Sequence, residues 1–259
     1  MLTGEFRHHR RFPSVRVPPR DVLIYLPPGY HNQAPRRYPV LYLQDGQNLF
    51  DGDTAYVRGQ EWQVDETAER LIRAREVEPL LIVGVYNAGD RRIDEYTPAR
   101  DARGRGGAAD RYAEFLIQEL KPFIDSEYRT LTDPPNTGLG GSSLGGLATL
   151  HIGLTHPHVF GKLAVHSPSV WWNGREILTR VHGLPAKPPL RIWLDIGTRE
   201  GDGTLADARM LRDALTAKQW RDSKDLWYHE ARGGSHSEAS WASRVSPMLR
   251  WLFPAPDEF

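Results

Sequence analysis

Strand-like and helix-like segments alternate along most of this chain, and that alternation constrains its fold more than any other feature. Nearly continuous apolar runs at 38–46 and 80–88 are typical of strands that helices cover on both faces. Further strands are predicted at 137–141, within 160–172, at 190–198 and at 225–231. Helical patterns lie at 64–77, 110–128, 147–157, 175–183, 204–220 and about 240–253. Since parallel strands need crossover connections, the chain predicts a mostly parallel sheet with helices on both faces.

The first forty residues have a different pattern, typical of short strands joined by tight turns. Segments 14–17 and 21–30 carry β-branched and apolar residues and are separated by Pro-Pro-Arg. They predict an antiparallel pair at the edge of the sheet, with residues 1–20 as an N-terminal edge segment. We find no repeat, linker or break in composition, so a single domain over 1–259 is predicted.

Composition excludes several classes of protein. With 33 basic and 33 acidic residues, the chain has no basic field to gather phosphates, so no nucleic-acid partner is expected. The absence of cysteine excludes a disulfide scaffold, a thiolate nucleophile and a sulfur-based zinc site. The longest apolar run, 79–85, is too short to cross a membrane, and the N-terminus lacks a secretory apolar core. We therefore expect a cytoplasmic protein with no membrane partner, metal or cofactor; the oligomeric state is left open.

One glycine-rich stretch matches a known arrangement around a nucleophile. Residues 141–145, Gly-Ser-Ser-Leu-Gly, fit G-x-S-x-G with Ser143 at the centre and Ser142 as its neighbour. In this arrangement the serine occupies a strained turn between a strand and a helix, and the glycines prevent Cβ collisions. The alternative is a glycine-rich packing turn, but the predicted strand at 137–141 and a helix beginning at Leu144 favour the nucleophile.

A nucleophilic serine needs a base and an acid, which follow it in chain order in hydrolases of this shape. His236 meets both requirements because it follows the last predicted strand; His166, which ends an earlier strand, is the runner-up. Glu200 lies just past strand 190–198 and is the predicted acid, with Asp202 in reserve. Asp195 lies inside that strand and is expected to brace a loop.

Two backbone N–H groups are predicted to stabilise the oxyanion that forms during acyl transfer. Leu144 directly follows the proposed nucleophile, and Gln47 follows Gly46 in the loop after strand 38–46. An ordinary tight turn would explain the second segment equally well if it stood alone. Its position after a buried strand favours an oxyanion donor.

Aromatic and polar side chains that follow the predicted strands are candidates for substrate binding. These are Trp62, Asn87, Arg92, Tyr96, Trp171 and Trp172. Such groups suit a sugar or an aromatic acyl ester, although each ring would serve equally well in core packing.

The chain resembles a known family through several of these segments taken in order. They are YPVLYLQDGQNLFD, EPLLIVGVYNAGDRRIDEYTP, FLIQELKPFIDSEYRT, GGSSLGGLATL, WLDIGTREGD and GGSHSEASWASR. Together, from about Val22 to Leu252, they resemble the putative esterase family of the α/β-hydrolases. That family includes S-formylglutathione hydrolases, feruloyl esterases, enterochelin esterases and mycolyltransferases.

The resemblance implies a three-layer α/β-hydrolase fold and a serine carboxylesterase without a cofactor. It implies that Ser143 is the nucleophile, His236 the base and Glu200 the acid, at a position where many relatives have Asp. It also implies that the amides of Gln47 and Leu144 form the oxyanion hole. The expected partner is a small-molecule ester, with carbohydrate and aromatic acyl esters as candidates. An acyltransferase with the same three residues and a non-catalytic binding protein of this fold are the alternatives.

Overall fold

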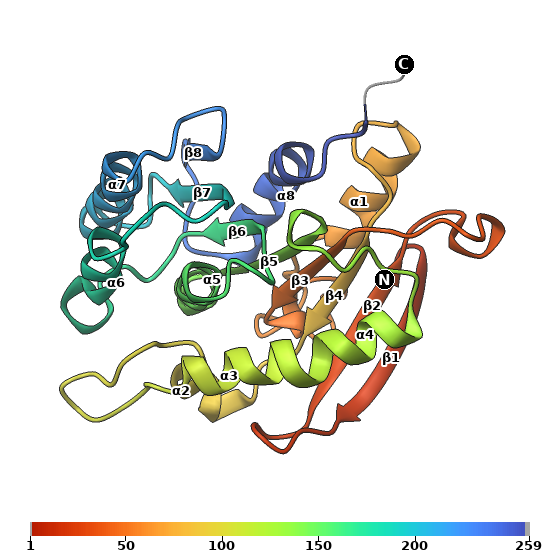
Figure 1. Ribbon diagram of the computed structural model, residues 1–259, viewed down its shortest axis with the longest axis horizontal. Helices are drawn as coiled ribbons and strands as arrows, with labels where there is room; N and C mark the ends of the chain where they lie inside the picture. The colour runs from red at the N-terminus through yellow and green to blue at the C-terminus, as the bar shows by residue number, and fades with distance from the viewer. Residues whose placement is uncertain (1, 257–259) are drawn as a thin grey trace.

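The computed structural model describes residues 2–256, and within them a single sheet of eight strands runs through the molecule (Figure 1). Its strands are β1 (Glu5–Phe12), β2 (Arg20–Leu26), β3 (Val40–Gln44), β4 (Leu81–Val85), β5 (Thr137–Ser142), β6 (Lys162–His166), β7 (Arg191–Gly197) and β8 (Leu226–Ala231). They lie in the order β1-β2-β4-β3-β5-β6-β7-β8. The pairs β1–β2 and β2–β4 are antiparallel and the others parallel. This confirms the predicted fold class; residues 1 and 257–259 of the predicted domain lie outside the described part.

Helices cover both faces of the sheet. They are α1 (Val64–Arg73), α2 (Arg92–Glu95), α3 (Ala109–Phe115), α4 (Lys121–Glu127), α5 (Leu144–Thr155), α6 (Trp172–His182), α7 (Asp202–Ala217) and α8 (Glu238–Leu252), with a π-helical turn at Leu116–Leu120 joining α3 to α4. Helices α1 and α8 share one apolar core with Leu41 and Leu43 of β3. Helices α3 to α7 share the other with Val40 and Tyr42 of the same strand. Both faces of the central strands are therefore apolar, because successive side chains point to opposite sides.

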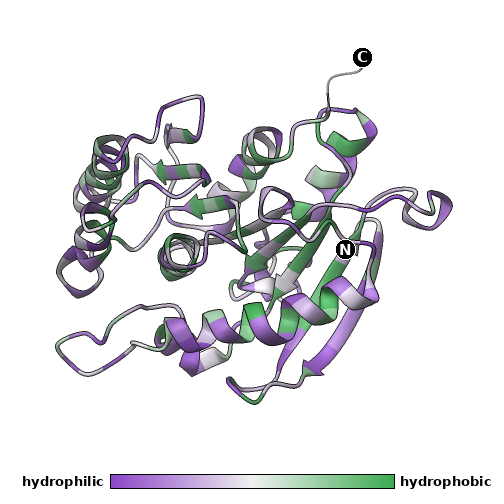
Figure 2. Ribbon diagram, viewed as in Figure 1, coloured by the Kyte–Doolittle hydropathy of each residue, from purple (hydrophilic) through white to green (hydrophobic). Residues whose placement is uncertain are grey.

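The antiparallel edge is present, but its first strand lies elsewhere than predicted. β1 spans Glu5–Phe12, whereas residues 14–17 belong to no strand. Pro18 and Pro19 follow that segment, and proline cannot donate to a strand ladder. β1 was missed because residues 7–11 are all arginine or histidine, and they show no alternation of apolar and polar side chains. Figure 2 shows this strand as mostly hydrophilic beside the hydrophobic central strands.

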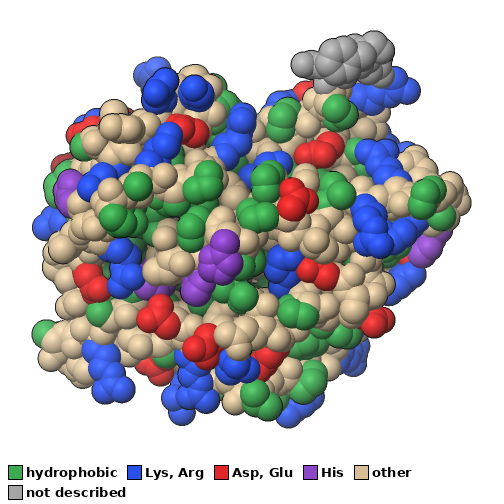
Figure 3. Space-filling model, viewed as in Figure 1, with side chains coloured by type: hydrophobic (Ala, Val, Ile, Leu, Met, Phe, Trp, Pro, Cys, Tyr) green, Lys and Arg blue, Asp and Glu red, His purple; other side chains and the backbone are tan. Residues whose placement is uncertain are grey.

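Charged side chains of both signs are interspersed over the face of the molecule shown in Figure 3. No helix among the described residues is long and apolar enough to cross a membrane.

The strand register brings polar residues from the middle of the sheet into one row. Ser142 of β5, His166 of β6, Asp195 of β7 and His229 of β8 are successive partners across neighbouring strands. The loops that follow these parallel strands leave the sheet on the same edge, where ligand sites of open α/β sheets lie.

Tight packing of α5 on β6 generates a prediction for stability. A Cβ added to Gly153 of α5 would lie 2.4 Å from Leu163 of β6, whereas a Cβ added to Gly203 of α7 would have no described atom within 4 Å. Gly153→Ala should lower the free energy of unfolding by about 1–2 kcal/mol, because overpacking outweighs the better helix propensity of alanine. Urea denaturation measures the change.

Gly203→Ala is the matched control and should be neutral or slightly stabilising, since it gains helix propensity without a collision. A Gly153→Ala variant as stable as the Gly203→Ala variant would contradict the close packing of α5 on β6.

Candidate active site

The turn from β5 to α5 places Ser143 in a backbone conformation that residues with a side chain rarely adopt. Its φ is 58° and its ψ is −121°. The N–H of Ser143 donates to the carbonyl of His166 at 3.0 Å, and its own carbonyl accepts from the N–H of Ser169 at 3.0 Å. Such backbone strain costs about 1–3 kcal/mol and persists where surrounding contacts fix it.

Glycines around this serine allow the backbone to pass close to its neighbours. A Cβ at Gly141 would lie 2.3 Å from Oε1 of Gln44, and one at Gly146 would lie 2.8 Å from the carbonyl oxygen of His166. The glycine pattern that singled out Ser143 in the sequence therefore has a steric cause.

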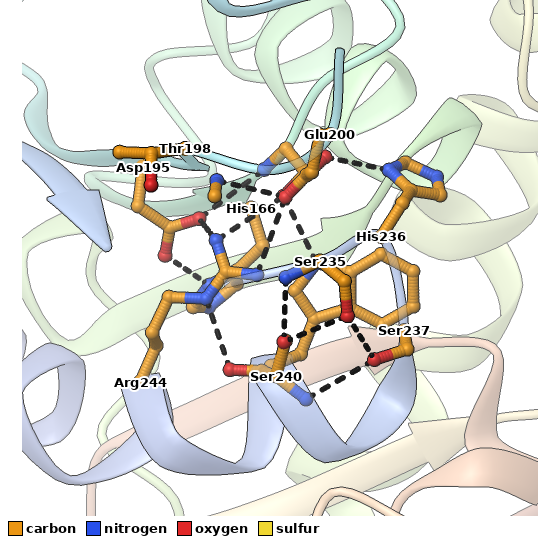
Figure 4. Close-up of polar contacts among 12 residues, drawn as sticks. His166, Asp195, Thr198, Glu200, Ser235, His236, Ser237, Ser240 and Arg244 are labelled. Atoms are coloured by element: carbon orange, nitrogen blue, oxygen red, sulfur yellow. Dashed lines mark hydrogen bonds and ion pairs between the residues drawn. The ribbon is translucent and has the colours of Figure 1, made fainter. Parts of the chain in front are cut away.

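Three of the predicted residues are joined by hydrogen bonds. Nε2 of His236 lies 3.0 Å from Oγ of Ser143. Nδ1 of the same ring lies 2.7 Å from Oε2 of Glu200 (Figure 4). Ser143 follows β5, Glu200 follows β7, and His236 lies between β8 and α8, so three separate strand ends supply them. The reserve acid Asp202 is exposed at the start of α7, and among the described residues it forms no hydrogen bond or ion pair with His236.

The surroundings of Glu200 keep its carboxylate charged. Burial raises the pKa of Glu200, but hydrogen bonds from His236, Ser167 and the N–H of Gly197 outweigh burial, and the pKa lies below its usual value. An ionised Glu200 accepts a hydrogen bond from the N–H group at Nδ1 of His236. Nε2 of the neutral imidazole is then free to accept the hydroxyl proton of Ser143.

His166, the runner-up for the base, lies in a different environment. It is fully buried, and its Nδ1 lies 2.5 Å from Oδ2 of Asp195. Its Nε2 has no hydrogen-bond partner among the described residues. Asp195 also accepts from the backbone N–H of Ser167, so it braces the loop after β6, as its place in the strand indicated. Burial raises the pKa of Asp195, but the opposing effect of His166 and Arg244 is larger, so the pKa lies below its usual value.

Both predicted oxyanion donors lie at turns close to the nucleophile. Gln47 is in the 3₁₀ turn Gly46–Asn48 after β3, and Leu144 is the first residue of α5. Neither backbone N–H donates to another group among the described residues. A Cβ at Gly46 would lie 2.6 Å from the backbone of Gly84, so glycine allows this turn to sit against β4.

A cavity of about 470 Å³ opens beside Ser143 and His236. Its other lining residues are Asp45, Gln47, Asn48, Tyr56, Val57, Asn87, Arg92, Ser142, Glu238 and Trp241. Two nitrogens of Arg92 donate to the two carboxylate oxygens of Asp45, both at 2.7 Å, and Asn87 donates to the same carboxylate. One fixed ion pair therefore forms part of the cavity wall.

Of the predicted substrate residues, Asn87 and Arg92 line this cavity, whereas the four aromatic residues do not. Trp62 is buried against the rings of Trp241 and His166. Trp171 is 51% exposed but lies outside the cavity lining.

Trp172 and Tyr96 are also buried. The indole N–H of Trp172 donates to the carbonyl of Ala99, and the hydroxyl of Tyr96 accepts from the N–H of Asp45. Three of the four predicted aromatic rings thus pack in the core, which disfavours contact with substrate, and the exposed ring of Trp171 lies outside the lining of this cavity.

Several residues of the site were missed in the sequence. Oγ of Ser169 lies 3.3 Å from Oγ of Ser143, and Glu238 and Trp241 of α8 line the cavity. Ser169 follows β6, so the strand-end rule could have found it. Glu238 and Trp241 begin a helix, and only the packing of α8 brings them to the cavity. Among the described residues, no group of three His, Cys, Asp or Glu side chains could hold a metal ion.

The chain is similar to known proteins over most of its length. A family model described as "Putative esterase" matches residues 18–252. The ferri-bacillibactin esterase BesA of Bacillus subtilis is 30% identical over 211 residues, covering 73% of this chain and 70% of that protein. The uncharacterised protein YbbA of the same organism is 25% identical over 248 residues, covering 90% of this chain and 92% of that protein.

Solved structures share the fold. The BES protein from Bacillus cereus superposes with a TM-score of 0.77 at 23% identity, covering 98% of this chain and 96% of that one. The enterobactin esterase FES from Shigella flexneri superposes with a TM-score of 0.77 at 20% identity, covering 97% of this chain and 60% of that one.

The lowered pKa of Glu200 predicts how stability changes with pH. A carboxyl group whose pKa is depressed on folding stabilises the protein above its unfolded value of about 4.3, and this stability is lost as pH falls through the folded pKa. Glu200→Gln should therefore reduce the free energy of unfolding at neutral pH and make its decline below about pH 4.3 less steep. Urea denaturation between neutral and acidic pH measures both effects.

The matched control is Asp202→Asn, which removes an exposed carboxylate two residues away and should leave the pH dependence of stability unchanged. If the free energy of unfolding of both variants falls as steeply with decreasing pH as that of the unaltered protein, the folded structure does not favour the charged form of Glu200.

Proposed function

Since the chain belongs to the putative esterase family and is a carboxylic ester hydrolase, we propose that it acts through Ser143 as a nucleophile. The observation that carries this proposal is the series of hydrogen bonds from Glu200 through His236 to Ser143. A base within 3.0 Å of a serine hydroxyl, itself oriented by a buried carboxylate, is the arrangement that makes serine nucleophilic.

In the first half-reaction, Oγ of Ser143 attacks the ester carbonyl while Nε2 of His236 takes the hydroxyl proton. The carbonyl oxygen becomes an oxyanion, to which the N–H groups of Gln47 and Leu144 donate. The imidazolium of His236 then gives its proton to the leaving alcohol as the C–O bond breaks. An acyl group remains on Ser143.

In the second half-reaction, water replaces the alcohol. His236 takes a proton from water, the resulting hydroxide attacks the acyl carbonyl, and the proton returns to Oγ of Ser143 as the acid leaves. Glu200 stays ionised throughout, holds the imidazole with Nδ1 towards itself, and stabilises the imidazolium in both halves.

The lining of the cavity favours as substrate a small ester with aromatic and polar groups, a class that includes aromatic acyl esters and acylated carbohydrates. Trp241 and the 86% exposed Tyr56 offer ring surfaces, while Asn87 and Arg92 offer hydrogen-bond donors. Relatives are named as a ferri-bacillibactin esterase and a xylanase/feruloyl esterase, which agrees with this class.

The nucleophile is tested by exchanging each of the two adjacent serines. Ser143→Ala should lower kcat for p-nitrophenyl acetate by roughly 1,000-fold or more, because no acyl-enzyme forms. Ser142→Ala is the matched control, since Ser142 also lines the cavity, and should stay within a few-fold of the unaltered protein. Full activity in the Ser143→Ala protein would refute the proposed mechanism.

The same proteins separate the alternatives. Labelling of Ser143 by a fluorophosphonate is expected, and its absence would favour a non-catalytic binding protein. With an added alcohol, hydrolysis should remain the main outcome. If the acyl group passes to the alcohol in preference to water, the protein is instead an acyltransferase.

The cavity generates a prediction for substrate binding. Tyr56→Ala should raise KM for a feruloyl ester about five- to tenfold with little change in kcat, since the loss of one aromatic contact is worth roughly 1–1.5 kcal/mol. Trp171→Ala removes another exposed ring, which lies outside the cavity lining, and should leave KM unchanged. If KM instead rises in Trp171→Ala and is unchanged in Tyr56→Ala, the acyl group lies against Trp171.

A further inference from the structure

Glu200 has two carboxylate oxygens, but only Oε2 faces His236. A carboxylate that was free to turn about its own axis would offer its oxygens to the imidazole in varying directions. Its side chain is buried completely, so protein groups determine which oxygen faces the histidine.

The other oxygen, Oε1, is held by two donors. The hydroxyl of Ser167 lies 2.6 Å from it, and the backbone N–H of Gly197 lies 2.8 Å from it. Nη2 of Arg244 stands further away, at 3.5 Å. Two good hydrogen bonds occupy the two lone pairs of Oε1, which leaves Oε2 for His236.

The direction of the Ser167 hydroxyl is determined by its other neighbours. A serine hydroxyl has one proton to donate and two lone pairs that accept. The indole N–H of Trp241 donates to Oγ of Ser167 at 3.0 Å, and Nη1 of Arg244 donates to it at 3.2 Å. Neither neighbour can accept a hydrogen bond here, so the proton of Ser167 points to Glu200.

Arg244 is itself fixed. It is 1% exposed, its Nη1 lies 2.6 Å from Oδ1 of Asp195, and its Nε donates to the carbonyl of Ser240 (Figure 4). The second carboxylate oxygen of Asp195 binds His166 and the indole N–H of Trp193. Residues at the ends of β6 and β7 and in α8 thus form one buried hydrogen-bond network next to Glu200.

We propose that Ser167 is a positioning residue for the reaction, which directs Oε2 of Glu200 to His236 because Arg244 and Trp241 fill its own acceptor sites. This inference rests on the proposed role of Glu200 as the triad acid. It assigns to Ser167 no contact with substrate.

The backbone of Ser167 supports this role. Its φ is 42°, in the left-handed region, and its N–H donates to the carbonyl of Asp195 at 2.9 Å. A residue other than glycine is uncommon there, and strain of this kind gathers at functional sites. At this position the turn after β6 aims the hydroxyl at Glu200 across β7.

The test is a cycle of variants assayed by kcat for p-nitrophenyl acetate. Ser167→Ala should lower kcat roughly tenfold and change KM less than about twofold, since it removes a hydrogen bond to a charged group that never touches substrate. In a Glu200→Ala background the same substitution should have almost no effect, because the group that it positions is gone.

Ser126→Ala is the control, since Ser126 is exposed on α4 and its hydroxyl donates to a backbone carbonyl. It should leave kcat unchanged in both backgrounds. If Ser167→Ala melts below the assay temperature, Ser167→Gly replaces it, because glycine also lacks the hydroxyl and readily adopts a φ of 42°. The effect of Ser167→Gly on kcat should also vanish in the Glu200→Ala background.

Equal losses in the presence and absence of Glu200 would overturn the inference and assign Ser167 a purely structural role, and an unchanged kcat in Ser167→Ala would overturn it directly. Either result, together with an inactive Ser143→Ala protein, would leave the proposed nucleophile in place. Activity in the Ser143→Ala protein would refute the proposed function instead.

Discussion

The buried carboxylate of Glu200 is the constraint around which the active-site edge of this protein is organised. A charge without exposed surface is costly unless hydrogen bonds replace the lost water. Here His236, Ser167 and the N–H of Gly197 supply those bonds from the loop after β8, the end of β6 and the end of β7. The hydrogen bonds that this one carboxylate needs therefore fix the relative positions of three strand ends.

The parallel arrangement of the central strands makes this convergence possible. Because β5, β6 and β7 run in the same direction, their following loops leave the sheet on one edge, and α8 returns across it with Trp241 and Arg244. The strained turn at Ser143 depends on the same neighbours, since its N–H donates to the carbonyl of His166.

Much of this arrangement was predictable from local patterns, and the failures have a common cause. The central strands, the helices between them and the turn at Ser143 follow from apolar periodicity and glycine spacing. Strand β1 was missed because arginine and histidine fill its middle without an apolar alternation, and Trp62 and Tyr96 were assigned to substrate although both are buried. A position after a strand end shows that a ring is near the site, but not which way it faces.

The sequence by itself determined the fold class, the family resemblance and the order of Ser143, Glu200 and His236, since periodicity, glycine spacing and chain order are local or linear properties. Only the tertiary structure decided which carboxylate oxygen meets the imidazole, which rings line the cavity, and that Ser167 and Arg244 lie behind Glu200. The physical reason is that burial and hydrogen bonding depend on segments far apart in the chain. Oγ of Ser167 and the side chain of Arg244 are 77 residues apart in sequence, yet lie 3.2 Å apart at their nearest polar atoms.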